Sequence, residues 1–196
     1  MDKVAKFRLF FGLELPDAVK QRLLTIQQPV AGARWQRADQ LHLTLVFLGS
    51  VEEKQLPNVR DAARNLPVEP FSLTVSGIGC FGHPGRPKNL WAGVQPVDEL
   101  AEVQSLLNQR LALSGFAQEK RTFWPHITLA RFKNGADSVA GLLKSDERRH
   151  AGSFLVDRVT LFESLLGEGG SVYQVIERFP LRSSNYIDRP HDGNFR

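Results

Sequence analysis

The chain has 196 residues, of which 42% are hydrophobic and 23% are charged, proportions that are ordinary for a soluble globular protein. No apolar run approaches the roughly 20 residues that a membrane-spanning helix needs, and the single cysteine, Cys80, excludes an internal disulfide. The formal net charge of +4 permits a polyanionic partner such as RNA without requiring one, because it is also an ordinary charge for solubility. We expect Cys80 to be buried and unreactive.

The N-terminal residues 1–6 carry no signal-peptide pattern, because the apolar stretch after them is interrupted by Arg8 and Glu14 and lacks a small-residue cleavage site. We therefore expect a cytoplasmic protein that does not associate with a membrane. Nothing in the sequence demands an oligomer, so we expect a monomer.

In chain order, the first predicted element is a strand over residues 7–15, which a proline ends. Asp17 is expected to cap the helix that follows, whose apolar residues recur at helical spacing: Val19, Leu23 and Ile26. A second strand, 41–47, carries His42, and the pair at 49–50 predicts a turn after it.

The same order of elements recurs later in the chain. A strand over 90–95 ends at a proline, an amphipathic helix over 98–113 stops before Gly115, and a strand carrying His126 follows. A strand–helix–strand unit used twice predicts two related lobes.

The remaining predicted elements complete a single domain. They are a helix over 52–66 interrupted near Pro57, a strand over 71–76, and late strands over 154–163 and 171–179 around a glycine-rich turn at 167–170. We predict an α+β fold over 1–182 with two pseudo-symmetric lobes, each with an antiparallel-type sheet flanked by helices, and a cleft between them. Residues 183–196 are polar and are expected to form a loose tail.

The most informative motif is His-x-Thr, which occurs twice, each time inside an apolar run. Because strand side chains alternate between faces, His42 and Thr44 share one face of their strand, and His126 and Thr128 share one face of theirs. A lone histidine in an apolar run is more often a core residue. The recurrence of both polar types at the same spacing on matching elements favours a composite site.

Two imidazoles, one neutral and one protonated, can run an in-line displacement at phosphorus without a metal. Thr44 and Thr128 can donate hydrogen bonds to the non-bridging phosphate oxygens. Arg131 lies an odd number of residues after His126, so it points to the opposite face unless a bulge redirects it; an arginine fork suits phosphate. Phe11 is an aromatic that can stack on a base if exposed, although such residues are more often in the core.

Other chemistries find little support. The segment 77–82 fits G-x-G-x-x-G, but the sequence after it cannot open a helix, so we reject a dinucleotide site and expect a flexible basic loop. Arg86 and Lys88 in this region can touch a substrate phosphate, although a solvated turn is the simpler interpretation. No closely spaced set of Cys and His residues supports a metal site, and we expect none.

On these residues the chain resembles the two-histidine (2H) phosphoesterases and, within them, the bacterial and archaeal RNA 2′,3′-cyclic phosphodiesterases, also called 2′-5′ RNA ligases. The resemblance extends over residues 7–179. It is carried by the segments 9–16, 41–49 and 125–131, together with the Gly-Cys-Phe-Gly sequence at 79–82 and the strand that follows.

The resemblance implies a bilobal fold with a metal-free cleft, no cofactor, and hydrolysis of a terminal RNA 2′,3′-cyclic phosphate to a 2′-phosphate. The RNA partner would be a tRNA fragment or an oligonucleotide, and the same residues would serve a 2′-5′ ligation. In the family's pattern His42 is the proton donor to the departing 3′ oxygen and His126 the base that activates water. Arg131 falls at a phosphate-binding position and Phe11 at a base-stacking one.

Two alternatives stay open. The substrate of the same fold can be another cyclic or 2′-5′ phosphodiester. A different class of function is a module that binds RNA ends without turning them over. From the residues alone, the acid and base roles of His42 and His126 can also be exchanged, because the two lobes are nearly symmetric.

Overall fold

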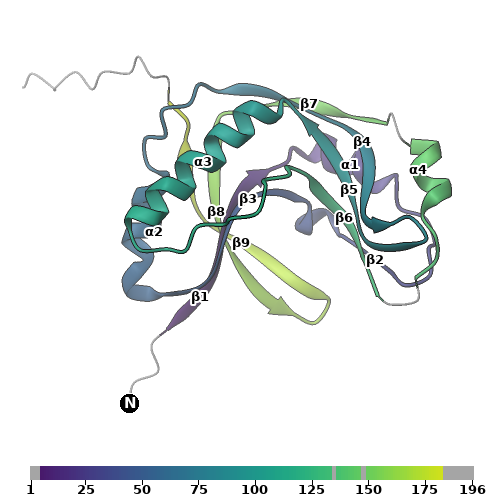
Figure 1. Ribbon diagram of the computed structural model, residues 1–196, viewed down its shortest axis with the longest axis horizontal. Coiled ribbons are helices and arrows are strands. Elements are labelled where there is room, and N and C mark those ends of the chain that lie inside the picture. The colour runs from purple at the N-terminus through teal and green to yellow at the C-terminus, as the bar shows by residue number, and fades with distance from the viewer. Residues whose placement is uncertain (1–4, 134–135, 147–148, 183–196) are drawn as a thin grey trace, which may run out of the picture.

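In the computed structural model, residues 5–133, 136–146 and 149–182 are described, and within them the chain forms an α+β fold (Figure 1). The strands are β1 (Lys6–Glu14), β2 (Ala33–Trp35), β3 (His42–Glu52), β4 (Phe71–His83), β5 (Arg86–Gln95), β6 (Ile127–Phe132), β7 (His150–Val156), β8 (Arg158–Gly167) and β9 (Gly170–Pro180). The helices are α1 (Asp17–Leu24), α2 (Leu56–Ala63), α3 (Val97–Leu113) and α4 (Ala140–Asp146), with short 3-10 turns η1 (Ala38–Gln40) and η2 (Glu53–Gln55). None of the described helices is both long and apolar enough to span a bilayer.

The strands form one antiparallel sheet that is built from two matching halves. Their order is β7-β4-β5-β6-β3-β1-β8-β9, with β2 added on β6. The half made of β3, β1, β8 and β9 mirrors the half made of β6, β5, β4 and β7. The halves meet where β3 pairs with β6, through Leu43 and Ile127, both fully buried.

The sheet is strongly curled. β7 and β8 lie near opposite ends of the strand order, yet only Asp157 separates them in sequence. The sheet therefore has to bend round until its ends approach each other, and the β8–β9 hairpin projects from the body (Figure 1).

The predicted repeat is present as β1-α1-β3 and β5-α3-β6. The helix of each unit packs against a strand of the other half, α1 on β7 and α3 on β3. One continuous apolar core runs through both units. The α+β class and the two related halves are confirmed, and a single sheet joins them.

Several predicted boundaries differ from the structure. Pro16 is the N-cap of α1 and Asp17 its first residue, because the Pro16 carbonyl already accepts the amides of Val19 and Lys20. The expected turn at 49–50 is a bulge inside β3, where Gly49 has a φ of 73°. The predicted strand 154–163 is two strands, broken at Asp157.

The G-x-G-x-x-G segment is also not a loop. Residues 77–82 continue β4 and pair with β5, so the chain turns back as a hairpin at Pro84–Gly85 and opens no helix. The segment therefore lacks the strand-to-helix turn that the dinucleotide-binding fingerprint requires. The predicted tail, 183–196, lies outside the described residues.

Candidate active site

Both His-x-Thr motifs lie at the junction of the two half-sheets. Leu43 and Ile127, the residues that follow the histidines, are directly paired. In an antiparallel pair the neighbours run in opposite directions, so His42 lies towards Thr128 and Thr44 towards His126. The leucines and isoleucine between them are buried, as the alternation predicted. The pairing therefore brings both motifs into one site.

Both ring nitrogens of His42 have partners. Nδ1 lies 2.7 Å from the carbonyl oxygen of Gln40, and Nε2 lies 3.0 Å from the Thr44 hydroxyl. A carbonyl only accepts, so Nδ1 carries the proton and donates it. In the neutral ring Nε2 is then unprotonated and accepts the Thr44 O–H.

His126 is oriented in the same way. Its Nδ1 lies 2.7 Å from the carbonyl oxygen of Trp124, again the residue two positions earlier in the chain. The same reasoning gives Nδ1–H, with the lone pair on Nε2. Each histidine therefore presents Nε2 as its reactive atom, held by its own strand.

Burial lowers the pKa of both imidazoles. For His42, burial lowers the pKa to about 4; the hydrogen bond to Gln40 opposes this shift, and the charges of Arg131 and His126 add to it. The pKa of His126 is lowered mainly by burial and further by Arg131, against its hydrogen bond to Trp124. Both rings are therefore neutral in the unliganded protein at pH 7.

A bulge in β6 turns Arg131 towards the histidines. Leu90 pairs with Ala130 and Trp91 with Thr128, which leaves Leu129 as an extra residue. The extra residue shifts the alternation, so Arg131 follows the face of Thr128. Its charge acts on both imidazoles, and together with Tyr173 it lines a cavity of about 60 Å³. Of the two irregularities that could redirect this side chain, a bulge or a bend, the bulge is therefore present in β6.

Aromatic rings frame each histidine. The Tyr173 ring on β9 meets the His42 ring edge-on at 4.7 Å between centroids, and the Phe10 ring lies 4.9 Å from it. In the other half, the Phe81 ring meets the His126 ring edge-on at 5.0 Å, and the Trp91 ring lies 6.4 Å from it.

Phe11 does not belong to this frame, and its prediction as a base-stacking residue is wrong. Its side chain has 0% exposure and packs edge-on against Phe179 in the core. A fully buried ring has no free face for a base. Phe10, its neighbour on the opposite face of β1, is the residue that contacts His42.

Gln40 is a further residue of the site that the sequence reasoning missed. Its buried side chain accepts the Arg37 amide N–H and donates to the Ser171 carbonyl at 2.8 Å, while its own carbonyl orients His42. Its position two residues before His42 was a usable signal. Tyr173 gave no such signal, because it is 131 residues from His42 in the chain.

Neither a reactive thiol nor a cluster of metal ligands is found among the described residues around this site. Cys80 is half-buried rather than fully buried, and burial raises the pKa of its thiol, which keeps it protonated at neutral pH. Over residues 5–133, 136–146 and 149–182, no three His, Cys, Asp or Glu side chains gather in a way that could hold a metal ion.

Comparison with known proteins agrees with this arrangement. The family model described as LigT-like phosphoesterase matches residues 13–91 and 93–173. An RNA 2′,3′-cyclic phosphodiesterase of Archaeoglobus fulgidus is 28% identical, over 88% of this chain and 99% of its own length. One from Thermus thermophilus is 32% identical, over 91% and 92%. The crystal structure of Escherichia coli LigT with 3′-AMP superposes with a TM-score of 0.73 at 27% identity, covering 90% of this chain and 99% of LigT.

Two motifs joined at one strand pair, on a sheet of two matching halves, are features of a two-histidine phosphoesterase. The chain belongs to the LigT-like phosphoesterase family.

Proposed function

We propose that this protein hydrolyses the terminal 2′,3′-cyclic phosphate of RNA to a 2′-phosphate, without a metal. The observation that carries the proposal is the pair of histidines at the strand junction, each with Nδ1–H tied to a carbonyl and Nε2 directed at the site. The names of the relatives support the choice of substrate.

In the proposed reaction, Nε2 of neutral His126 takes a proton from water, and the water oxygen attacks phosphorus. The bond from phosphorus to the 3′ oxygen breaks, and that oxygen takes the proton from Nε2 of protonated His42. Arg131 neutralises charge on the non-bridging oxygens. With the 5′-hydroxyl of a second RNA in place of water, the same steps would form a 2′-5′ phosphodiester bond and release the 3′ hydroxyl.

Protonation of His42 also changes what Thr44 can do. While His42 is neutral, Nε2 accepts the Thr44 O–H. Once Nε2 is protonated it becomes a donor, and the Thr44 hydroxyl is free to donate to phosphate. We expect the Thr128 hydroxyl to donate to the second non-bridging phosphate oxygen, because Thr128 lies towards His42 across the strand pair. The anionic substrate raises the pKa of His42, so binding itself prepares the acid.

The test is the product formed from a short RNA with a 2′,3′-cyclic end, in the presence of a chelator. We expect a 2′-phosphate from the wild type, and loss of turnover by about 100-fold or more in H42A and in H126A. H150A is the matched control, since His150 is an exposed histidine on β7, and it should retain activity.

Near wild-type turnover in either H42A or H126A would overturn the mechanism. A 3′-phosphate product would instead show that the 2′ oxygen leaves. Tight binding of the cyclic end without product on long incubation would indicate an RNA-end binding module.

A further inference from the structure

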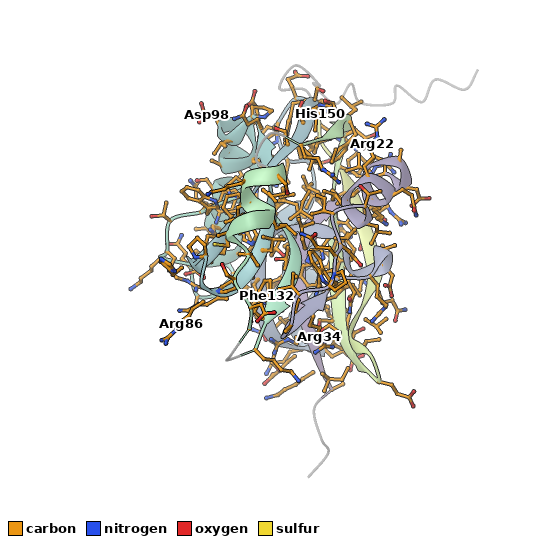
Figure 2. All side chains as sticks on the ribbon, turned by 90° about the vertical axis from the view of Figure 1, so that its right-hand side faces the viewer. Arg22, Arg34, Arg86, Asp98, Phe132 and His150 are labelled. Atoms are coloured by element: carbon orange, nitrogen blue, oxygen red, sulfur yellow. The ribbon has the colours of Figure 1, made fainter. Side chains whose placement is uncertain are left out.

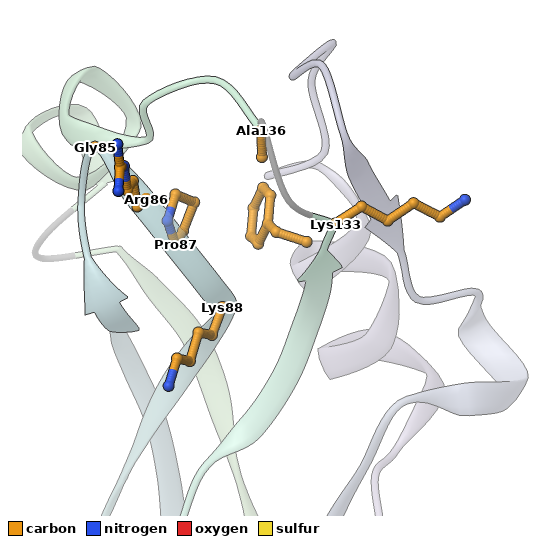
Figure 3. A pocket seen from close by; sticks show the side chains of 7 residues that line it. Gly85, Arg86, Pro87, Lys88, Lys133 and Ala136 are labelled. Atoms are coloured by element: carbon orange, nitrogen blue, oxygen red, sulfur yellow. The ribbon is translucent and has the colours of Figure 1, made fainter.

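A hollow of about 600 Å³ lies between the start of β5 and the end of β6, the strand that carries Arg131 (Figure 3). We call it the basic hollow; its walls include Arg86, Pro87, Lys88, Phe132, Lys133 and Ala136. The volume falls within the usual range of ligand pockets.

The hollow forms because two strands separate. β5 and β6 stay paired as far as Asn89 and Arg131. One residue further on, Phe132 keeps its pairing with β2 on the other edge of β6 but has no partner on β5, and Pro87 pairs with β4 in its own hairpin. The hollow therefore begins one residue beyond Arg131, about 3.3 Å along the strand. A ligand that reaches past Arg131 enters it.

Its rim carries three cations, and none of the described residues that line it has a carboxylate. Arg86, Lys88 and Lys133 are exposed, and within the described residues they form no ion pair. Other arginines of this protein do have acidic partners, as Arg37 has Asp39 and Arg178 has Glu14. Unpaired cations around a concavity favour an anionic ligand over a solvated surface.

The floor of the hollow is apolar and aromatic. The half-buried Phe132 ring lines the hollow together with Pro87 and Ala136. Figure 2 shows Arg86, Phe132 and Arg34 towards the same end of the molecule, away from Asp98 and His150. An aromatic platform with cations around it is how proteins hold single-stranded RNA, the ring taking a base and the cations the phosphates.

We infer that the basic hollow binds the RNA strand upstream of the reacting end, with a base on Phe132 and backbone phosphates at Arg86, Lys88 and Lys133. The inference rests on the proposed function for its substrate. It predicts that the enzyme discriminates between an RNA end and a free cyclic nucleotide through residues that take no part in the chemistry.

The test compares two substrates, a short RNA with a 2′,3′-cyclic end and a nucleoside 2′,3′-cyclic monophosphate. For the triple variant R86A/K88A/K133A we expect kcat/KM on the RNA to fall about tenfold or more, mainly through KM, with a salt dependence of log kcat/KM shallower by about 0.7 per lost phosphate contact. Turnover of the mononucleotide should stay within about twofold, since none of its phosphate contacts is removed.

The matched control removes the same charge elsewhere. The control residues, Lys6, Lys54 and Arg64, lie at or beyond the end of β1 and β3 that is far from His42. The variant K6A/K54A/R64A should have the same kcat/KM as the wild type on both substrates. F132L should weaken RNA binding about fivefold or more without changing the salt slope, because it removes the ring face and keeps the apolar volume.

Equal losses on both substrates, or equal losses in the triple variant and its control, would overturn the inference. Affinity for the same RNA ending in a 2′-phosphate, measured by fluorescence anisotropy, tests the hollow without turnover. A wild type that hydrolyses neither substrate would defeat the proposed function, and the anisotropy series would still decide the role of the hollow.

Discussion

The two imidazoles of the site share a motif but differ in their surroundings. Phe10, Phe162 and Tyr173 enclose His42, whereas the ring of His126 is more exposed. The pKa of His42 is accordingly lowered to about 4, chiefly by burial. The residue proposed as the acid is therefore neutral in the free enzyme at pH 7 and depends on the substrate's charge for its proton.

This dependence predicts the pH profiles. In the free enzyme, protonated His42 and neutral His126 coexist best between about 4 and 6.5, because both pKa values lie at or below the ordinary 6.5. We expect kcat/KM on the RNA to be highest in that range and the falling limb of kcat to lie at higher pH, since bound phosphate raises the pKa of His42. Steady-state kinetics across the acid and neutral range checks this, and a kcat/KM optimum above pH 7 would contradict it.

The same lowered pKa makes stability depend on pH. The unfolded chain takes up a proton at His42 near pH 6.5, and the folded one only near 4. The contribution of neutral His42 to the free energy of unfolding is therefore complete above pH 6.5. As the pH falls towards 4, roughly 1–3 kcal/mol of this stability is lost. Urea unfolding of the wild type and H42Q at both ends of this window should show a steeper loss for the wild type. H150Q should follow the wild type.

The paired phenylalanines of β1 show where sequence reasoning stops at this scale. Alternation requires one of Phe10 and Phe11 to face the site, but β1 is bulged on both sides of this pair, so counting along the strand cannot say which. By contrast, the alternation of His42 and Thr44 with buried leucines could be predicted, because that motif is local to one strand.

At the scale of elements, Gly79 on β4 keeps Trp91 against His126. A Cβ at position 79 would overlap the six-membered ring of Trp91. That ring in turn packs against Trp124 and His126. The absence of a side chain at this one position thus sets the wall of the second half-site.

We expect G79A to destabilise the protein by about 1–3 kcal/mol and to lower turnover, because Trp91 must move away from His126. G141A is the control: a Cβ there meets no atom within 4 Å, and alanine in helix α4 should be neutral or stabilising by about 0.5–1 kcal/mol. Thermal unfolding and kcat of both variants check this. A G79A protein with unchanged stability would contradict the packing described.

The local periodicity was enough to predict β1, α1, α3 and the histidine strands. It missed β2 and α4, which are short. It also merged β7 with β8, because Asp157 is the only residue between these two strands and one polar residue does not mark a strand end. The direction of Arg131 depends on a bulge at Leu129, which arises from pairing with β5 rather than from its own neighbours.

For the molecule as a whole, the junction of the two halves is the critical contact. Leu43 is fully buried where the half-sheets join, within a core shared by both. L43A should cost about 2–5 kcal/mol and lower one common unfolding transition, seen equally by tryptophan fluorescence and far-UV circular dichroism. L166A removes a leucine that is 99% exposed and should change stability by less than about 0.5 kcal/mol. Two separated transitions would show that the halves unfold independently.

β8 and β9 complete the half of the sheet that begins with β1 and β3, which we call the N-terminal half. This order has a consequence for synthesis of the chain. These two strands supply Phe162 and Tyr173 beside His42, yet they follow all the other described elements along the chain. The other half of the sheet, made of β4, β5, β6 and β7, can assemble while translation is still under way. The pocket of His42 has to wait until the end of β9 has left the ribosome, so a nascent or prematurely terminated chain carries a histidine motif without its active site.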